Sequence, residues 1–359
     1  MVREKLKSHI EERKSEGIEI PLKEDVQAKN STTLLEDVTL IHNALPEINF
    51  DEIDTSTNFL NHKFSAPFLI DAMTGGTKEA TKINGNLASA AEELGIAMGV
   101  GSQRAGLSSI KIAETYAIAR KKAPSAFLIA NIGGAQLIDG LSLKKIKKLI
   151  EMINANAIAI HLNPLQEIIQ PEGEPKYKGV LDKISWVSSE INVPVIVKEI
   201  GCGISREVAT KLEIAGVSAV NIAGLGGTSW AAVEYFRAKK KNEYDKAELG
   251  KLFWDWGVPT AASIIEVKST TNIPIIASGG IRTGIDIAKC ISLGASLVGI
   301  AQPLLPPAVK SSREVVTKID KILQELKTSM FVTGSRTTRD LSDSRHVITG
   351  KLSEWQMAL

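Results

Sequence analysis

The sequence predicts an α/β protein of the (β/α)8 TIM-barrel class, with an N-terminal extension and a long loop between strands 6 and 7. About eight apolar runs of strand length follow one another from Pro67, separated by helix-like stretches. The runs are apolar throughout, as in parallel strands that are buried on both faces. Several helix-like stretches end in glycine, a common helix stop. Eight such units favour a closed barrel over a doubly wound sheet.

The predicted strands and helices alternate along the chain in a regular order. The strand-like runs are residues 67–76, 97–104, 127–134, 157–164, 195–203, 219–227, 274–280 and 297–303. Helix-like stretches between them include residues 83–95, 143–155, 205–216 and 283–294. After the last run, residues 312–331 have the spacing of an amphipathic outer helix.

The segments outside this rhythm divide the chain. Residues 1–66 form a polar extension that is expected to wrap the barrel base or reach over its mouth, residues 67–330 form the barrel, and residues 331–359 form a basic, polar tail. The segment 225–272 is much longer than the other connections and contains Trp254 and Trp256. Loops of this size in barrels commonly serve as lids or subunit contacts.

Composition excludes several classes of function. Among 359 residues, 43 Lys and Arg oppose 41 Asp and Glu, so no global field predicts binding to nucleic acid or to a membrane surface. No window approaches the roughly 18 apolar residues of a membrane span. Cys202 and Cys290 fit neither a disulfide framework nor a metal-binding spacing. A cytoplasmic location, with reduced thiols, is therefore expected.

The residues that follow the strands are expected to gather at one end of the barrel and to form one site. Ser278–Gly284, SGGIRTG, follows the seventh run, where barrels bind phosphate on loop amides and a helix N-terminus. Its glycines allow close backbone approach, and Arg282 offers a bidentate partner. The alternative is a tight turn with a solvated arginine.

Lys198 ends an apolar run, so its charge must reach the mouth or be costly to bury. Over a flavin ring it would stabilise the anionic reduced form. The alternative is a lysine paired with Glu199 or a neighbour. Possible hydrogen-bond partners for the flavin are the side chains of Thr74, Ser102, Asn131 and Thr228, each of which is singly more common as a turn or cap residue.

Two further motifs suit anionic ligands. Gly101–Arg104, GSQR, sets a hydroxyl, an amide and a guanidinium beside each other and suits a second anion, although the tetrapeptide alone is a weak signal. In HLNPLQE, residues 161–167, Asn163, Pro164 and Gln166 fit a capping box that starts a helix. Glu167 remains for a Mg²⁺ beside a phosphorylated ligand. His161 could donate a hydrogen bond to the same phosphates. It could equally be a core residue whose hydrogen bonds are all made within the protein.

Two other signals are weak. GLGGTSW, residues 224–230, lacks the spacing of a dinucleotide-binding fingerprint, which argues against a tightly held nicotinamide domain. Cys202 has no histidine near it in sequence, so a nucleophilic role is disfavoured.

Taken together, the motifs resemble the type 2, flavin-dependent isopentenyl diphosphate isomerases through most of the barrel. The matching stretches occur in the family's order: MTGG at 73–76, MGVGSQR at 98–104, HLNPLQE at 161–167, QPEGEP at 170–175, GGTSW at 226–230, WGVPTAASI at 256–264 and SGGIRTG at 278–284. The resemblance implies interconversion of isopentenyl and dimethylallyl diphosphate in isoprenoid biosynthesis. It also implies FMN, Mg²⁺, NADPH as reductant and a homo-oligomer, a tetramer or octamer.

The resemblance also assigns site residues. It implies that FMN is held by Ala72, Met73, Thr74, Ser102, Asn131, Lys198, Thr228, Gly280, Ile281, Arg282, Ala301 and Gln302. It implies that the substrate is met by Ser102, Gln103, Arg104, His161, Asn163 and Gln166, with Gln166 catalytic and Glu167 on Mg²⁺. The family begins with an Arg-Lys pair a few residues before a histidine, and both contact the diphosphate. The corresponding stretch is taken as Lys5–His9, so Lys5 and Lys7 are expected to replace that pair.

The implied chemistry moves a double bond by one carbon without a carbonyl to acidify the carbon. Reduced flavin could act as acid and base through N5 without net redox change, while Mg²⁺ and cationic groups anchor the diphosphate. The alternatives are an FMN-dependent oxidoreductase of a 2-hydroxy acid and a non-catalytic barrel that binds a phosphorylated ligand. The oxidoreductase needs a base such as histidine after the sixth run, where the sequence has Gly224, Leu225 and Gly226.

Overall fold

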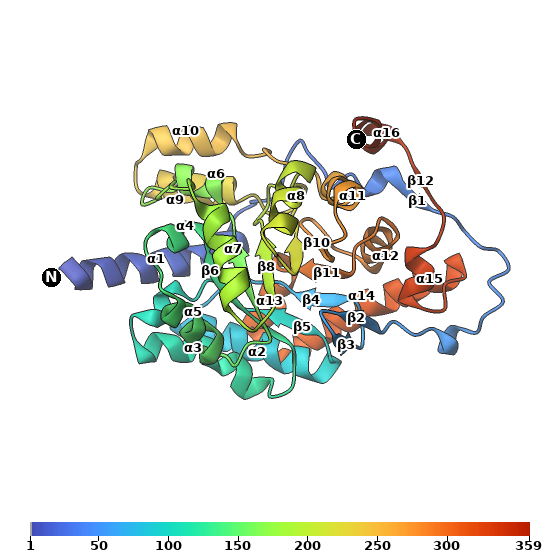
Figure 1. Ribbon diagram of the computed structural model, residues 1–359, viewed down its shortest axis with the longest axis horizontal. Coiled ribbons are helices and arrows are strands. Elements are labelled where there is room, and N and C mark those ends of the chain that lie inside the picture. The colour runs from blue at the N-terminus through green and yellow to red at the C-terminus, as the bar shows by residue number, and fades with distance from the viewer. Residues whose placement is uncertain (1) are drawn as a thin grey trace.

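Eight parallel strands form a closed barrel, which confirms the predicted fold class (Figure 1). The computed structural model describes the backbone of residues 2–359 and the side chains of residues 12–359. The barrel strands are β4 (Phe68–Ile70), β5 (Ala97–Gly99), β6 (Leu128–Gly133), β7 (Ala157–His161), β8 (Val195–Lys198), β9 (Ala219–Asn221), β10 (Ile275–Ser278) and β11 (Leu297–Ile300). β11 pairs with β4 in parallel and closes the ring. Nearly every strand residue is buried, because helices cover the outside and side chains fill the inside.

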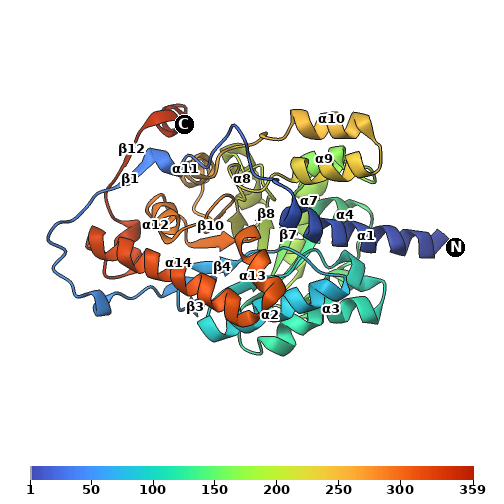
Figure 2. The ribbon, with the colours of Figure 1, turned by 180° about the vertical axis from the view of Figure 1, so that it is seen from behind.

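Helices surround the barrel in the order that the sequence predicts. The longer ones are α2 (Lys78–Leu94), α3 (Ile110–Lys122), α5 (Leu143–Met152), α7 (Val180–Glu190), α8 (Arg206–Ile214), α11 (Thr260–Thr270), α12 (Gly284–Ser292) and α14 (Ser312–Thr333). α2 shows how the sequence sets such a helix: the Thr77 side chain caps its first turn and Gly95 ends it with a φ of 61°. Figure 2 shows α14 along the outside of the barrel, where it packs against α2.

Short elements connect the strands to these helices at the end that holds their carboxyl termini. They are the 3-10 helices η3 (Arg104–Leu107) and η4 (Gln302–Leu304), and the short helices α4 (Gly134–Ile138), α6 (Pro164–Ile169) and α13 (Leu305–Lys310). Each begins within a few residues of a barrel strand, so these elements fix the direction of the polar side chains at the barrel mouth.

The N-terminal extension reaches both ends of the barrel. It contains α1 (Val2–Lys23), η1 (Leu35–Asp37), β1 (Val38–Leu40), η2 (Phe50–Glu52) and the hairpin of β2 (Thr57–Phe59) and β3 (His62–Phe64). Phe59 and Phe64 of the hairpin are buried in the hydrophobic cluster inside the barrel base. α1 lies at the other end, where its residues line the cavity described below.

The C-terminal residues are folded and pack on the extension. They form α15 (Thr338–Ser342), β12 (His346–Ile348) and α16 (Gly350–Met357). β12 pairs antiparallel with β1, so segments far apart in sequence form a small two-stranded sheet outside the barrel, on the side opposite α1 (Figure 1).

The long connection between the sixth and seventh barrel strands is helical. It carries α9 (Trp230–Lys240) and α10 (Tyr244–Leu252), which pack on each other before α11 begins. Trp254 is buried against Ile20 and Val26 of the extension, whereas Trp256 is 62% exposed. Among the helices of residues 2–359, none has the length and apolar character required to cross a bilayer.

Candidate active site

A cavity of about 260 Å³ lies at the carboxyl ends of the barrel strands. It brings together nearly all the residues that the sequence nominates and the structure describes. Those that line it are Ala72, Met73, Thr74, Ser102, Arg104, Asn131, His161, Asn163, Gln166, Glu167, Lys198, Thr228, Gly280, Ile281, Arg282, Ala301 and Gln302. The clustering follows from barrel topology, since every parallel strand ends at the same rim.

Gln103 is an exception, and the structure corrects the expectation that it faces the substrate. Its side chain is fully buried and does not line the cavity. The amide nitrogen donates to the Leu149 carbonyl at 3.0 Å, and the amide oxygen accepts from the Asn131 backbone N–H at 2.9 Å. Gln103 therefore joins the ends of two neighbouring strands and fixes Asn131 from behind.

Two glycine turns meet at the cavity wall. Gly280, with a φ of 72°, lies against the loop after β9: a Cβ there would come 2.5 Å from the Gly226 carbonyl oxygen. A Cβ on Gly227 would come 2.3 Å from the Gly280 nitrogen. Only glycine permits this backbone packing, which leaves an open cradle beside Arg282.

The first amides of α12 are already occupied. The Asp286 carboxylate accepts from the N–H groups of Arg282 and Thr283 at 3.1 and 2.9 Å, and Glu325 accepts from Gly284 at 2.9 Å. The helix N-terminus predicted to bind phosphate is thus capped by protein carboxylates. An anion in this cradle is left with the loop amides and the Arg282 side chain.

Arg282 also contacts the N-terminal extension. Its Nη2 donates to the Gln27 side-chain oxygen and its Nη1 to the Ile281 carbonyl at 3.1 Å. Burial lowers the pKa of Arg282, but an arginine stays charged. The solvated arginine of the alternative interpretation is therefore not what the structure shows.

Lys198 is buried at the end of β8. Its Nζ donates to the Glu199 backbone carbonyl at 2.8 Å and lies 3.8 Å from Oδ2 of Asp71. Asp71 also accepts from the Asn221 side chain at 2.9 Å. Sequence reasoning missed Asp71 and Asn221, although both interrupt apolar runs near a strand end. The ammonium thus lies at the cavity wall beside a buried carboxylate.

The Glu199 carboxylate does not pair with Lys198. It accepts backbone N–H groups from Ile200, Gly201 and Cys202 at 2.6, 2.7 and 2.5 Å, and so orders the turn after β8. Burial raises the pKa of Glu199 to about 7, against the opposing effect of these bonds. Burial also raises the pKa of the Cys202 thiol, which agrees with its low weight as a nucleophile.

His161 is held as a neutral ring. Its Nδ1 lies 2.8 Å from Oδ1 of Asn131, an oxygen that can only accept, so Nδ1 carries the proton and Nε2 is an acceptor. Burial, followed by the charges of Lys198 and Lys14, lowers the pKa of His161 to about 3. A cationic contact from His161 to phosphate is therefore disfavoured.

Residues 161–167 differ from expectation at the helix start. Pro164 begins α6, as predicted, but Asn163 makes no side-chain cap bond. Its amide instead donates to Oε1 of Gln166 and Oε1 of Glu167, both at 3.0 Å. The predicted capping box is absent because the side chain of Asn163 bonds to other side chains instead of to the first backbone N–H groups of α6. Tyr177, which sequence reasoning missed, donates its hydroxyl to Oδ1 of Asn163 at 2.8 Å.

Gln166 and Glu167 are held in fixed orientations. The Gln166 Nε2 donates to Oε1 of Glu234 at 2.8 Å. Oε2 of Glu167 accepts from the Gln170 amide and the Glu174 backbone N–H, both at 2.9 Å. These donors hold the carboxylate in one direction, as a metal ligand requires.

Two cations of α1 that were not predicted, Arg13 and Lys14, line the cavity. The side chains of Lys5 and Lys7 lie outside the described residues. Lys14 donates to the Ser102 carbonyl at 2.9 Å, and its Nζ lies 5.7 Å from the centroid of the Tyr116 ring. Burial and the nearby Arg13 lower the pKa of Lys14 to about 7. An adjacent Arg-Lys pair is the signal by which the sequence could have indicated Arg13 and Lys14.

A family model and two solved structures match this chain. The model of the FMN-dependent dehydrogenase family matches residues 161–349. A mandelate oxidase crystal structure superposes with a TM-score of 0.61 at 15% identity, covering 88% of this chain and 90% of that one. A structure described as a lactate oxidase from Pediococcus acidilactici gives 0.67 at 17% identity, covering 97% and 94%. At such identities these two show the fold alone.

Full-length relatives are much closer in sequence. The isopentenyl-diphosphate delta-isomerase of Methanothermobacter thermautotrophicus is 49% identical, covering 96% of this chain and 95% of that protein. The protein of the same name from Methanosarcina barkeri is 48% identical, covering 97% and 94%, and that from Pyrococcus furiosus is 49% identical, covering 96% and 88%. The chain therefore belongs to the type 2, FMN-dependent isopentenyl-diphosphate delta-isomerase family.

Proposed function

We propose that the protein converts isopentenyl diphosphate to dimethylallyl diphosphate by a 1,3-allylic proton shift, with FMN, Mg²⁺ and NADPH as reductant. The observation that carries the proposal is a single cavity with two separate sets of cations. Arg282 adjoins the glycine cradle after β10, whereas Arg13, Lys14 and Arg104 come from α1 and the loop after β5. A cavity with cations at two places can bind two phosphorylated ligands, a cofactor and a substrate.

The cradle fits the FMN phosphate. Because protein carboxylates cap α12, the phosphate would lie on the loop amides of Gly280 and Ile281 and on the Arg282 side chain, with Ala301 and Gln302 beside it. The flavin ring would be held by the residues at the other strand ends, namely Ala72, Met73, Thr74, Ser102, Asn131, Lys198 and Thr228. Lys198 would meet the negative charge of the reduced ring.

The second set of cations suits the substrate diphosphate. Arg13, Lys14 and Arg104 line the cavity, and diphosphate needs several charged donors. Asn163 and Gln166 would meet the substrate from α6. Binding energy at the diphosphate would fix the small alkene, which has few groups of its own to hold.

Glu167 fits a single-carboxylate Mg²⁺ site. Within the described residues no group of three or more acidic, histidine or cysteine side chains could enclose a metal. Mg²⁺ does not need one, since it keeps several waters and takes one or two carboxylates together with phosphate oxygens. The hydrogen bonds from Asn163 and Gln170 would aim the carboxylate at a diphosphate-bound ion.

Reduced FMN would supply the acid and base for the allylic shift. The chain's own part is to orient and to exclude water. The Gln166 amide, which does not titrate, is locked between Asn163 and Glu234 and would hold the alkene against the flavin. The neutral ring of His161 would keep positive charge away from the reacting carbons.

The test is a substrate comparison. Purified protein with FMN and Mg²⁺ is given isopentenyl diphosphate anaerobically with NADPH, or lactate in air with the flavin left oxidised, and products are followed by NMR. We expect dimethylallyl diphosphate from the first and no oxidation of the second, with loss of activity on chelation of Mg²⁺. Oxidation of the 2-hydroxy acid without isomerisation would favour the alternative enzyme. A protein that binds no FMN would favour the non-catalytic barrel.

A homo-oligomer, tetrameric or octameric, is proposed from the family alone.

A further inference from the structure

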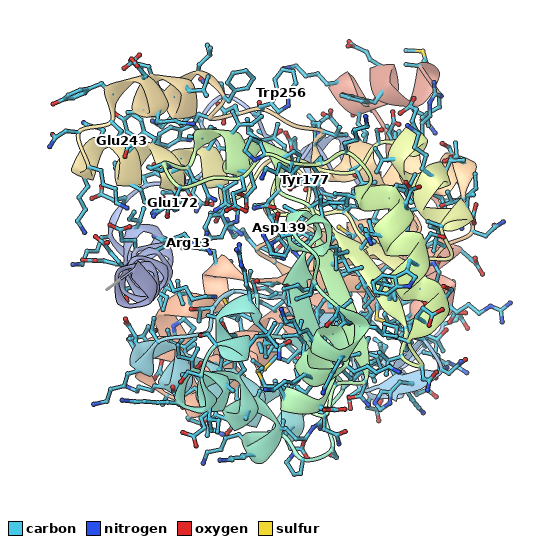
Figure 3. All side chains as sticks on the ribbon, turned by 60° about the vertical axis from the view of Figure 1, so that its left-hand side comes forward. Arg13, Asp139, Glu172, Tyr177, Glu243 and Trp256 are labelled. Atoms are coloured by element: carbon cyan, nitrogen blue, oxygen red, sulfur yellow. The ribbon has the colours of Figure 1, made fainter. Side chains whose placement is uncertain are left out.

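A buried guanidinium joins three segments around the cavity. Arg237 of α9 is 1% exposed and meets a carboxylate from each segment. Its Nε lies 2.9 Å from Glu16 of α1, its Nη1 2.6 Å from Glu234 of α9, and its Nη2 2.5 Å from Glu172, which follows α6. Figure 3 shows Glu172 close to α1, with Arg13 beside it.

Each carboxylate adjoins a residue of the candidate site. Glu234 uses its second oxygen to accept from Gln166. Glu172 precedes Glu174, whose N–H donates to Glu167. Glu16 lies on α1 between Lys14 and Gly17, both of which line the cavity. Arg237 therefore connects the helix that carries the N-terminal cations with the segment that carries Gln166 and Glu167.

The spacing of residues along α1 determines which side of the helix each of its charged side chains lies on. At about 100° per residue, Arg13 and Gly17 share the face toward the cavity, while Glu16 and Lys14 point to opposite sides of that face. Glu16 reaches Arg237 on α9, and Lys14 reaches the Ser102 carbonyl after β5. α1 is thus tied to one cavity wall by each side chain, so its rotation about its own axis is fixed.

The charges fit an orienting role better than a stabilising one. Two buried carboxylates, Glu16 and Glu234, and the partly exposed Glu172 surround one guanidinium. The second oxygen of Glu16 is met only by Lys240, at 3.3 Å, within the described residues. Burial raises the pKa of Glu234. Apolar side chains of similar volume often give equal or greater stability than such a cluster. The three ion pairs of Arg237 instead hold three segments in one arrangement.

We propose that Glu16 and Arg237 are positioning residues that set the rotation of α1, and so hold Arg13 and Lys14 toward the substrate diphosphate. The proposal rests on the proposed function, because that function assigns the diphosphate to these two cations. Glu16 does not line the cavity and can act only through α1, whereas Arg237 does line it, so the test variant is made at Glu16.

The primary variant is Glu16→Gln, which keeps the size of the side chain and removes its charge. KM for isopentenyl diphosphate should rise about tenfold, the value of one charged hydrogen bond, with kcat and FMN affinity nearly unchanged. Amide hydrogen exchange of the peptide covering residues 12–23 should speed up in the same variant. The matched control is Glu19→Gln on the same helix, where Glu19 pairs with exposed Lys23. It should change neither measurement.

A double-mutant cycle separates positioning from general stabilisation. In an Arg13→Ala, Lys14→Met background, Glu16→Gln should raise KM by less than twofold, because the groups through which it acts are gone. An equal rise in both backgrounds overturns the proposal, as does unchanged hydrogen exchange in Glu16→Gln. The third outcome is that Arg13→Ala and Lys14→Met leave KM unchanged while hydrogen exchange in Glu16→Gln still speeds up. In that case the assignment of the diphosphate to Arg13 and Lys14 fails, but the role of Glu16 and Arg237 in fixing α1 stands.

Discussion

The ammonium of Lys14 lies at the cavity wall with a pKa lowered to about 7 by burial and by Arg13. In the free enzyme this cation is present below that pH and is lost as the pH rises through it. We therefore predict that kcat/KM for isopentenyl diphosphate falls above about pH 7, since this ratio reports the free enzyme. Lys14→Arg, which stays charged, should flatten the fall. Identical profiles for the two proteins would rule out Lys14 as the titrating group.

Glu167→Gln tests whether the Glu167 carboxylate binds Mg²⁺. The glutamine keeps the side chain's size and can still accept from Asn163, but it removes the charge that Mg²⁺ requires. We expect most turnover to be lost while the protein stays yellow and folded. Turnover should be measured across a Mg²⁺ titration together with the flavin spectrum. Normal Mg²⁺-dependent activity in the variant would refute the metal site.

Arg282→Ala tests the phosphate cradle. It removes the one side-chain cation beside the glycine turn, so FMN affinity should weaken by about 1.5–3 kcal/mol. Fluorescence titration of the apoprotein with FMN measures this directly. Riboflavin, which lacks the phosphate, is the matched ligand and should lose little affinity. Unchanged FMN binding would place the phosphate elsewhere.

At the scale of elements, the hairpin β2–β3 is structural and remote from the chemistry. Phe64 is 1% exposed and packs inside the barrel base, at the end opposite the cavity. Phe64→Ala should lower the free energy of unfolding by about 3–5 kcal/mol, the usual cost of such a cavity. KM should be unchanged. Denaturant unfolding and steady-state kinetics together check this, and a large shift in KM would show that the base and mouth are coupled.

How far the sequence predicts an element depends on the range of the interactions that set it. The barrel strands were predictable because burial on both faces leaves apolar runs, and Pro164 marks the start of α6 because proline suits a first turn. The position of α1 could not be predicted, since it depends on a contact between Arg237 and Glu16, which lie 221 residues apart in the sequence. Gln103 was misjudged for the same reason: its partner at Leu149 is invisible in a local motif.

At the scale of the whole molecule, one barrel serves different reactions. The oxidases of similar fold share only 15–17% identity with this chain and show the fold alone. A fold does not specify a reaction, so the function of this chain is argued from the residues at its rim. After β9, where an oxidoreductase of 2-hydroxy acids is expected to need a base, the chain has Gly224, Leu225 and Gly226. The strand ends predicted most of the site, but the cations from α1 required the folded chain, because the extension has no fixed place in barrel topology.

The central claim is that this rim supports isomerisation without net redox change. The direct measurement is NMR of isopentenyl diphosphate with the anaerobic, NADPH-reduced holoenzyme and Mg²⁺, with the flavin absorbance recorded before and after. The account predicts that dimethylallyl diphosphate accumulates over many turnovers while the flavin stays reduced. Absence of that product, or reoxidation of flavin in proportion to product formed, would contradict it.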